Sequence, residues 1–592
     1  MPIVNDGMGH DKIETKGTLP KSSGTPGPPI PRTDSFLDEE RVVLTWRSWV
    51  VVLISCFAIF TQVFVVTAAG SVIAFIIRDL GEPEIAGEYP RGPLLMQSVL
   101  SPIIGRLSDV LDRKYLAGVP PLIAFAGAVM SARAESMSIL IGGGVLIGTT
   151  LSTIAIVQAI PSEILPLKFR ALANGFAFLA GSFGGLVGVL GSGGVTNINP
   201  SGWRNIFWIQ AAFHGLTAVG LLFFYWPPPS DYPRLSLREL VWACDPIGSL
   251  LMTAGTTLLL LAFDWAGGTF QWHDPHVLGP LITGVVLLVL FGLYEWKGRT
   301  DGIVAHVFFE RGPNFGLSVF AFAVEGFVFY SAVNSVVPQI VLNLGFESNS
   351  WRISVRQLSY NLLIIVTSLP VTWYATKYKD LKSPLLVTFF FFLVVSICYA
   401  TITPELNKAQ IGYNILTGIG QSGPLTLIVA LTQFTAPHQF LSTATGLAFS
   451  ARAIGGAFGS AILDAIINNK LASHDADVGS AVVAAGLPAG SVPALLRALK
   501  SGMLASVPGI SDAIINAATH TSRNAYARAY RFAWIPVIPF VVAAMVCIAC
   551  LKGVEELMTE HVEATVEPRG PAEAINEPEK ESVEEKERTS TV

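Results

Sequence analysis

The stretch Gly105-Arg106-Leu107-Ser108-Asp109-Val110-Leu111-Asp112-Arg113-Lys114 is a short charged segment between two long apolar runs. A helix needs roughly twenty apolar residues to cross the hydrocarbon core of a bilayer, so the apolar runs are candidate membrane spans. Lys and Arg accumulate in the cytoplasmic loops of membrane proteins. The stretch therefore predicts a tight turn at the cytoplasmic membrane surface.

The composition of the whole chain agrees with a membrane protein. Of 592 residues, 51% are hydrophobic and only 14% are charged, and the mean hydropathy is +0.54. This is too apolar for a soluble enzyme of this length. We expect an all-α polytopic membrane protein, no nucleic-acid partner because no basic face is evident, and no metal because the five cysteines lack metal-ligand spacing.

Hydropathy windows of about nineteen residues predict about fourteen spans in a six, two, six arrangement. The predicted parts are a disordered cytoplasmic arm (1–45), an N-terminal six-helix bundle (46–228), two linker helices (229–300), a C-terminal six-helix bundle (301–552) with an extracellular excursion (468–531), and a disordered acidic cytoplasmic tail (553–592). An even number of spans puts both termini on one side, and the Lys and Arg of the short loops favour the cytoplasm. The second span is weak, because Glu88 and Arg91 interrupt its start.

A second charged loop, Pro161 to Arg170, contains Glu163 and Arg170. Asp109 can accept hydrogen bonds from exposed helix-terminal amides, while Arg113 can reach carboxylates of the neighbouring loop. Glu163 and Arg170 are the expected partners of Arg113 and Asp109. We predict a cytoplasmic gate formed by Gly105, Asp109, Arg113, Lys114, Glu163 and Arg170; the alternative is a pair of ordinary charged turns.

The pattern Gly-x-Leu-x-Asp, followed after three residues by Arg-Lys, resembles the loop between the second and third helices of major facilitator transporters. The Glu163 and Arg170 pair is similar to one that many of these proteins carry in the next cytoplasmic loop. The resemblance implies two six-helix bundles that rock around a midplane substrate site. Asp112 stands where the family usually has Gly.

The fifth predicted span is rich in glycine, including Gly175, Gly184, Gly188 and Gly193. Small residues allow helices to approach closely in lipid, so we expect helix packing here. The spacing also resembles the antiporter signature of drug:proton exchangers, except that Gly185 replaces the proline and Val189 replaces the second glycine of the final pair. The fourth span lacks the arginine that such exchangers usually carry, so proton coupling is expected elsewhere.

Ionisable residues inside spans are costly and are therefore functional candidates. Glu325 lies deep in the ninth span, where burial favours the neutral form of a carboxyl, and is the first choice for proton coupling. Its alternative role is a structural acid paired with a base on another helix. Asp264, at the end of the seventh span, is a further candidate, and its alternative is a position at the membrane interface. Arg452, inside the thirteenth span, completes the candidate set; it is either an anion contact in a cavity or a structural partner of an acid.

Amide side chains in the spans are candidates for the wall of a substrate cavity. They are Gln62, Gln158, Gln210, Asn334, Asn361 and Gln421. Apolar walls with a few hydrogen-bonding groups suit a moderately hydrophobic, uncharged organic molecule. Each amide alone is more often a helix-to-helix hydrogen bond.

Three further stretches, Gly418 to Leu431, Gly202 to Gln210 and Ala484 to Pro488, resemble the fungal trichothecene efflux pump family. The resemblance covers nearly the whole chain outside the tails. It implies a fourteen-helix facilitator of the plasma membrane that exports toxins or drugs, with siderophore transporters close in sequence character; a vacuolar location is the alternative.

The sequence as a whole predicts a secondary active transporter that exports a hydrophobic secondary metabolite or drug in exchange for protons. The nucleotide-binding pattern Gly-x-x-x-x-Gly-Lys-Ser/Thr is absent from the sequence, which disfavours ATP-driven pumping. We expect no cofactor besides the proton gradient, no enzymatic activity, and a monomer in the lipid bilayer. The alternatives are proton-coupled uptake of an iron-siderophore complex and a non-transporting membrane sensor.

Overall fold

The computed structural model describes residues 46–80, 88–111, 113–198, 200–227, 236–266, 270–347, 350–501 and 509–559. The predicted arm (1–45), Asp112, and residues 560–592 of the predicted tail lie outside the described residues. Within these ranges the chain is built from helices and their connections. The prediction of an all-α membrane protein is confirmed.

The first half of the described chain is a bundle whose fourth span is broken in two. Its helices are α1 (Trp46–Leu80), α2 (Glu88–Val110), α3 (Arg113–Ala132), α4 (Met137–Ser152), α5 (Ile154–Ile164), α6 (Arg170–Ile198) and α7 (Trp203–Phe224). The weak second span is a continuous helix that begins at Glu88.

Three helices connect the halves: α8 (Leu237–Ala243), α9 (Pro246–Trp265) and α10 (Pro275–Leu293). Local sequence fixes where the two longer ones start. Asp245 caps α9 by accepting a hydrogen bond from the Gly248 amide at 3.0 Å, and Asp274 caps α10 by accepting one from the His276 amide at 2.9 Å. In each case proline follows the cap at the first helical position, where its missing N–H costs nothing.

The second half contains several spans built from consecutive helical segments. The segments are α11 (Val307–Glu310), α12 (Asn314–Gly326), the π-helical η4 (Phe327–Val336), α13 (Val337–Asn343), α14 (Ser350–Tyr378), α15 (Lys382–Tyr399), α16 (Asn407–Gln421), α17 (Pro424–Thr435), α18 (Leu441–Leu471), α19 (His474–Ala484), α20 (Val492–Ser501), α21 (Asp512–Trp534) and α22 (Val537–Ala549). The segment 468–531 is thus largely helical, and α21 and α22 together form one candidate span, Asp512–Ala549.

Thirteen helical stretches of the described chain are long and apolar enough to cross a membrane. α2 is not among them, although its 23 residues are sufficient in length, because polar residues such as Gln97, Ser98 and Ser101 interrupt its apolar sequence. Large apolar side chains point outward, for example Leu216 and Ile282, both 60% exposed. Such a surface suits contact with lipid, so the protein is a multi-pass membrane protein.

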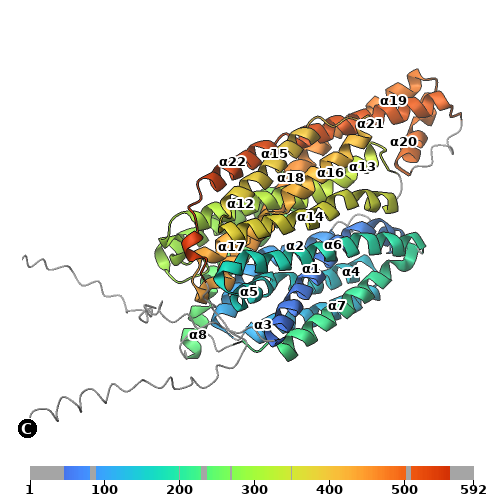
Figure 1. Ribbon diagram of the computed structural model, residues 1–592. Helices are drawn as coiled ribbons and strands as arrows, with labels where there is room; N and C mark the ends of the chain where they lie inside the picture. The colour runs from blue at the N-terminus through green and yellow to red at the C-terminus, as the bar shows by residue number, and fades with distance from the viewer. Residues whose placement is uncertain are drawn as a thin grey trace, which may run out of the picture. The chain divides into compact units, whose positions relative to one another are not determined.

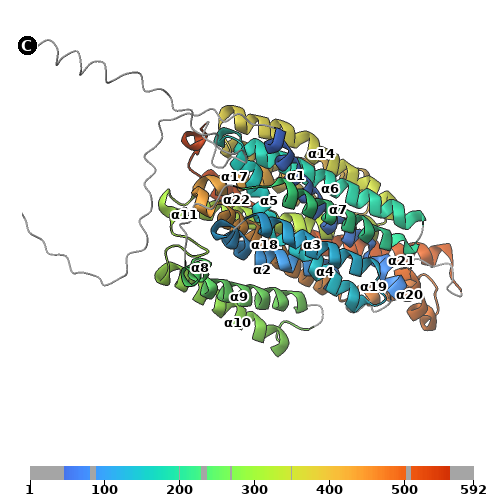
Figure 2. The ribbon, with the colours of Figure 1, turned by 90° about the horizontal axis from the view of Figure 1, so that it is seen from below.

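The two halves meet along two seams, α2 against α18 and α6 against α14. Figure 1 shows the N-terminal helices in blue to teal and the C-terminal helices in yellow to red. In Figure 2, α9 and α10 run together at the edge of the bundle beside α2. The seam between α2 and α18 contains the candidate site.

The segment after α22 contacts both halves at one end of the bundle. The backbone N–H of Lys552 donates to Asn314 Oδ1 at 2.9 Å, and the Lys168 N–H, in the loop after α5, donates to the Thr559 carbonyl at 2.8 Å. Met558 is fully buried. The folded chain therefore continues past residue 553, where the disordered tail was expected to start.

Candidate functional site

The end of α2 is tied to the start of α18 by one carboxylate. Asp109 accepts hydrogen bonds from the backbone N–H groups of Ser442 at 3.2 Å and Thr443 at 2.8 Å, and from the Thr443 hydroxyl at 2.7 Å. These amides belong to the first turn of α18, where N–H groups lack partners within the helix and the helix dipole favours negative charge. Asp109 therefore holds the two halves together by capping a helix of the other half.

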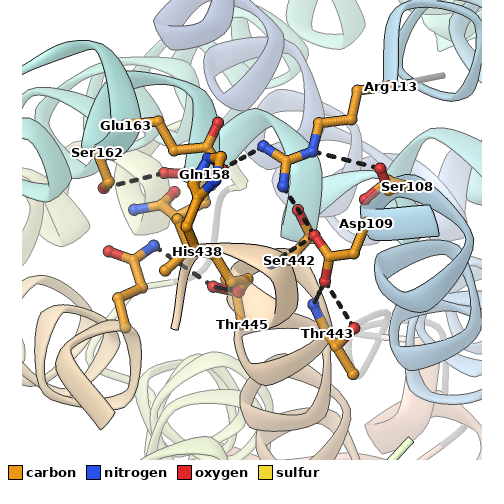
Figure 3. Close-up of polar contacts among 12 residues, drawn as sticks. Ser108, Asp109, Arg113, Gln158, Ser162, Glu163, His438, Ser442, Thr443 and Thr445 are labelled. Carbon is orange, nitrogen blue, oxygen red and sulfur yellow. Dashed lines mark hydrogen bonds and ion pairs between the residues drawn. The ribbon is translucent and has the colours of Figure 1, made fainter. Parts of the chain in front are cut away.

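Arg113 links this carboxylate to the second charged loop. Its guanidinium forms an ion pair with Asp109 at 2.9 Å and another with Glu163, and its Nε donates to the Ser108 carbonyl at 3.3 Å. His438, just before α18, lies 3.6 Å from Glu163. Figure 3 shows Arg113 between the two acids. The predicted contact between Arg113 and Glu163 is thus present.

Arg170 has a different partner from the expected Asp109. Its Nη1 donates to the Gln433 carbonyl of α17 at 3.1 Å, and its guanidinium lies 5.0 Å from the Phe434 ring centre. Asn174, one turn further along α6, donates to the Gln433 side chain at 2.9 Å and accepts from Gln158 at 2.7 Å. The reason is register: Arg170 starts α6, which faces α17, whereas Asp109 faces α18.

Two further gate candidates take part in packing. A Cβ added to Gly105 would lie 2.5 Å from the Ser442 carbonyl oxygen, so glycine permits the close approach of α2 and α18. Lys114 is buried and its ammonium lies over the ring of Trp226. We name the set Asp109, Arg113, Glu163, Ser442 and Thr443 the gate cluster.

A cavity of about 710 Å³ lies further along the same seam, away from the gate cluster. It is lined from the first half by α1, α2 and α6, from the second half by η4, α13, α14 and α18, and from the linker by α9. On α18 the gate cluster occupies the first turn, whereas the cavity residues begin at Ala453. On α2 the cavity residues end at Ser98, well before Asp109. The seam is therefore closed at the gate cluster and hollow beyond it.

Of the amides predicted to line a cavity, Asn334 does so. The other five are not among the residues that line this cavity. Gln62 donates to the Thr150 carbonyl at 2.8 Å, Asn361 to the Gln357 carbonyl at 3.2 Å, Gln421 to Glu325, and Gln158 to Asn174, while Gln210 is fully buried in α7.

The cavity wall also contains polar residues that the sequence did not single out. They include Ser98, Thr257, Gln339, Gln357 and Asp464. Asp264, a coupling candidate, lines the cavity as well. A helical face that alternates polar and apolar residues at three- and four-residue spacing is the only sequence signal for such positions.

Glu325 and Arg452 form a buried ion pair between α12 and α18. The guanidinium contacts both carboxylate oxygens, with Nη2 3.0 Å from Oε1, and Glu325 also accepts from Gln421 at 2.6 Å. Glu325 is fully buried and Arg452 is 4% exposed. The structure thus joins the two candidates to each other, and Arg452 is a partner of an acid.

Tyr330 connects this pair to the cavity. Its hydroxyl accepts from Arg452 Nη1 at 2.7 Å and donates to Gln97 of α2 at 3.5 Å, and its side chain lines the cavity. Tyr330 lies in η4, a π-helical segment, and such segments are frequent at functional sites. The network runs from a buried acid to the cavity wall and on to the other half.

The glycines of α6 lie where this helix packs against α1 and against α14. An added Cβ would lie 2.2 Å from the Phe60 carbonyl at Gly184 and 2.3 Å from the Thr67 hydroxyl at Gly188, both on α1. Gly175 and Gly193 face Thr372 and Ser354 of α14. Glycine therefore serves packing both within the first half and across the second seam.

Known proteins with similar sequences are fungal transporters. The chain is 27% identical over 545 residues to the MFS-type transporter prx5 of Penicillium rubens, an alignment that covers 90% of this chain and 95% of that protein. It is 25% identical to the trichothecene efflux pump TRI12 of Trichoderma arundinaceum, with 93% of this chain and 92% of the pump covered.

Solved structures show the same fold at low sequence identity. A double-tryptophan mutant of XylE aligns with a TM-score of 0.52 and 12% identity, covering 86% of this chain and 98% of that one. The family model of the Major Facilitator Superfamily matches residues 55–460. The predicted resemblance is confirmed, and the chain belongs to the Major Facilitator Superfamily.

Proposed function

We propose that the protein exports moderately hydrophobic, uncharged organic molecules from the cell in exchange for protons. The observation that carries the proposal is the state of the seam between α2 and α18, which the gate cluster closes at one end while the 710 Å³ cavity lies beyond it. A site of this size between two repeat halves is what alternating access requires.

The expected topology indicates the side of the membrane to which the cavity belongs in this conformation. If the gate cluster lies at the cytoplasmic surface, as the basic residues of its loops favour, the cavity belongs to the outward side. The full-length similarity to a trichothecene efflux pump supports export of a toxin or secondary metabolite. The plasma membrane is the proposed location, with both termini in the cytoplasm.

Proton coupling is assigned to the ion pair of Glu325 and Arg452. Protonation of Glu325 removes the charge that holds Arg452, and a buried guanidinium without its acid is strongly destabilised. Arg452 then shifts, and because Tyr330 bonds both Arg452 and Gln97, the shift reaches the cavity wall and the opposite half. Protonation and substrate binding thus act on one network.

The test uses everted plasma-membrane vesicles from a yeast that expresses the chain. Their outer face is the cytoplasmic one, so an exporter driven by proton exchange accumulates substrate inside when the lumen is made acidic. The probes are a trichothecene and Nile red, an uncharged fluorescent dye. We expect accumulation that disappears when nigericin and potassium collapse the pH gradient.

Three results would overturn the proposal. Accumulation that is unaffected by loss of the gradient contradicts proton exchange. Absence of accumulation, together with ferric-siderophore uptake by intact cells, indicates an importer, and absence of both activities indicates a protein that does not transport.

A further inference from the structure

The cavity has a third wall that belongs to neither six-helix bundle. The linker helix α9 and the residue that ends it contribute Thr257, Leu260, Leu261, Phe263, Asp264 and Ala266 to the lining. Of these, Thr257, Leu260, Leu261 and Asp264 recur at helical spacing. The intervals of three, four and seven residues place them on one side of the helix. α9 therefore turns a continuous face toward the cavity.

The opposite side of α9 is occupied by α10. A Cβ added to Gly255 would lie 3.2 Å from the Gly284 carbonyl, and one added to Gly284 would lie 2.8 Å from the Leu259 amide. The two backbones thus approach closely through small residues. α10 is the outer member of the pair, since Ile282 is 60% and Val289 57% exposed, and Figure 2 shows it farther from α2 than α9.

Both ends of the linker pair are fastened to α2. Arg106 donates through Nε to the Ala243 carbonyl, just before α9, at 3.0 Å, and through Nη2 to the Asp301 carbonyl, after α10, at 2.8 Å. Near the C-terminal end of α9, the ring of Phe263 contacts the ring of Phe458 on α18, and the ring centres are 5.6 Å apart. The attachment to α2 is polar and buried. The packing against α18 is apolar, and Met252 of α9 belongs to the same buried apolar cluster as Ala444 and Leu447 of α18.

We propose that α9 is a substrate-contacting wall of the transport site and that Thr257 and Leu261 determine substrate selectivity. This rests on the proposed function, because it identifies the walls of the same cavity. Thr257 offers a hydroxyl and Leu261 an apolar surface, which suits an uncharged molecule with few polar groups. The linker helix α9 is then part of the binding site rather than only a connection between the halves.

The first experiment measures whether α9 lines a water-filled cavity. In a variant without the five native cysteines, Thr257→Cys and Leu261→Cys are treated in intact cells with a membrane-impermeant maleimide. The controls are Leu259→Cys, which faces α10, and Ile282→Cys, on the outer face of α10. We expect labelling at 257 and 261, none at the controls, and slower labelling when a trichothecene or Nile red is present. Labelling of all four positions or only of the controls overturns the proposal, and so does labelling at 257 that neither compound slows.

The second experiment measures selectivity with the larger side chain of tryptophan. Thr257→Trp is expected to change the ratio of trichothecene to Nile red transport by about tenfold, the scale on which pocket shape discriminates ligands, whereas Ile282→Trp leaves the ratio unchanged. An unchanged ratio in Thr257→Trp overturns the role in selectivity. If the wild type fails to export, the proposed function fails, while the labelling pattern still reports whether α9 lines the cavity.

Discussion

The carboxylate of Asp109 on α2 accepts a hydrogen bond from the Thr443 amide of α18 at 2.8 Å, across 334 residues of sequence. It also forms an ion pair with Arg113. One side chain thus serves as a cap for a helix of the other half and as an anchor for the neighbouring loop. The closed end of the seam depends on both contacts.

The first prediction concerns the charge of Asp109. Asp109→Asn keeps an oxygen acceptor but loses the charge, and hydrogen bonds with a charged group contribute about 1.5–3 kcal/mol. We expect the closed end to open at least about tenfold more often and transport to slow. Maleimide labelling of Ser101→Cys, a position buried in the seam, measures the opening. Glu310→Gln, at an exposed acid, is the control and should leave labelling unchanged.

The second prediction concerns exchange of the two charges. Asp109→Arg combined with Arg113→Asp preserves a pair of opposite charges, yet an arginine at 109 cannot accept from the Ser442 and Thr443 amides. We therefore expect the double variant to transport as poorly as Asp109→Arg alone. Recovery of transport to the wild-type rate would show that the ion pair matters and the helix cap does not.

The third prediction concerns Glu325. Glu325→Gln leaves Arg452 buried without its acid, which costs about 3–5 kcal/mol, so we expect loss of proton-driven transport and a lower thermal midpoint in detergent. Glu325→Gln with Arg452→Gln removes both charges. It is expected to recover the midpoint but not the transport. Proton-driven transport in the double variant would contradict the coupling role.

The fourth prediction compares two glycines of α6. Gly184→Ala forces a Cβ against the Phe60 carbonyl of α1, and such overpacking costs about 1–3 kcal/mol. Gly191→Ala meets no atom within 4 Å and removes a flexible residue from a helix, a gain of about 0.5–1 kcal/mol. The thermal midpoint should fall in the first variant and not in the second. A fall of equal size in both would mean that contact with α1 is not the cause.

The fifth prediction is a pH dependence at the end of α1. Hydrogen bonds from Arg204 and Trp203 lower the pKa of Asp79, the latter at 3.0 Å. A lowered pKa in the folded state contributes stability above the unfolded pKa, and this is lost as the pH falls through the folded one. For a partly exposed pair we expect about 1 kcal/mol or less. Asp79→Asn should therefore lower the thermal midpoint at pH 7 and lower it less as the pH falls below the unfolded pKa, a trend that thermal melts across this range would reveal.

Sequence patterns predicted the spans because hydropathy is a local property. α21 escaped this signal, since Asn516, His520 and Arg523 interrupt its apolar residues, and its helix is recognisable only where it continues into α22. The second span is weak in the sequence because Glu88 and Arg91 lie at its start, yet α2 is a continuous helix from Glu88 onward.

The sequence identified the gate residues but could not assign all their partners. Arg113 was expected to contact Glu163, and the two form an ion pair. Arg170 instead donates a hydrogen bond to α17, because the orientation of a helix depends on tertiary packing. Glu325 and Arg452 were each recognised as costly inside a span, but their pairing joins positions 127 residues apart. Which amides line the cavity also depends on how the helices pack, and the sequence does not show this. Of the six predicted amides, Asn334 lines the cavity.

The segment that ends at Thr559 has a consequence for biosynthesis. Because the Thr559 carbonyl receives the Lys168 amide and Met558 is buried, this contact between the halves forms only after nearly the whole polypeptide has left the ribosome. A nascent chain that stalls before this point has both bundles but lacks this contact between them, and quality-control proteases would meet a bundle that is incompletely closed at this end.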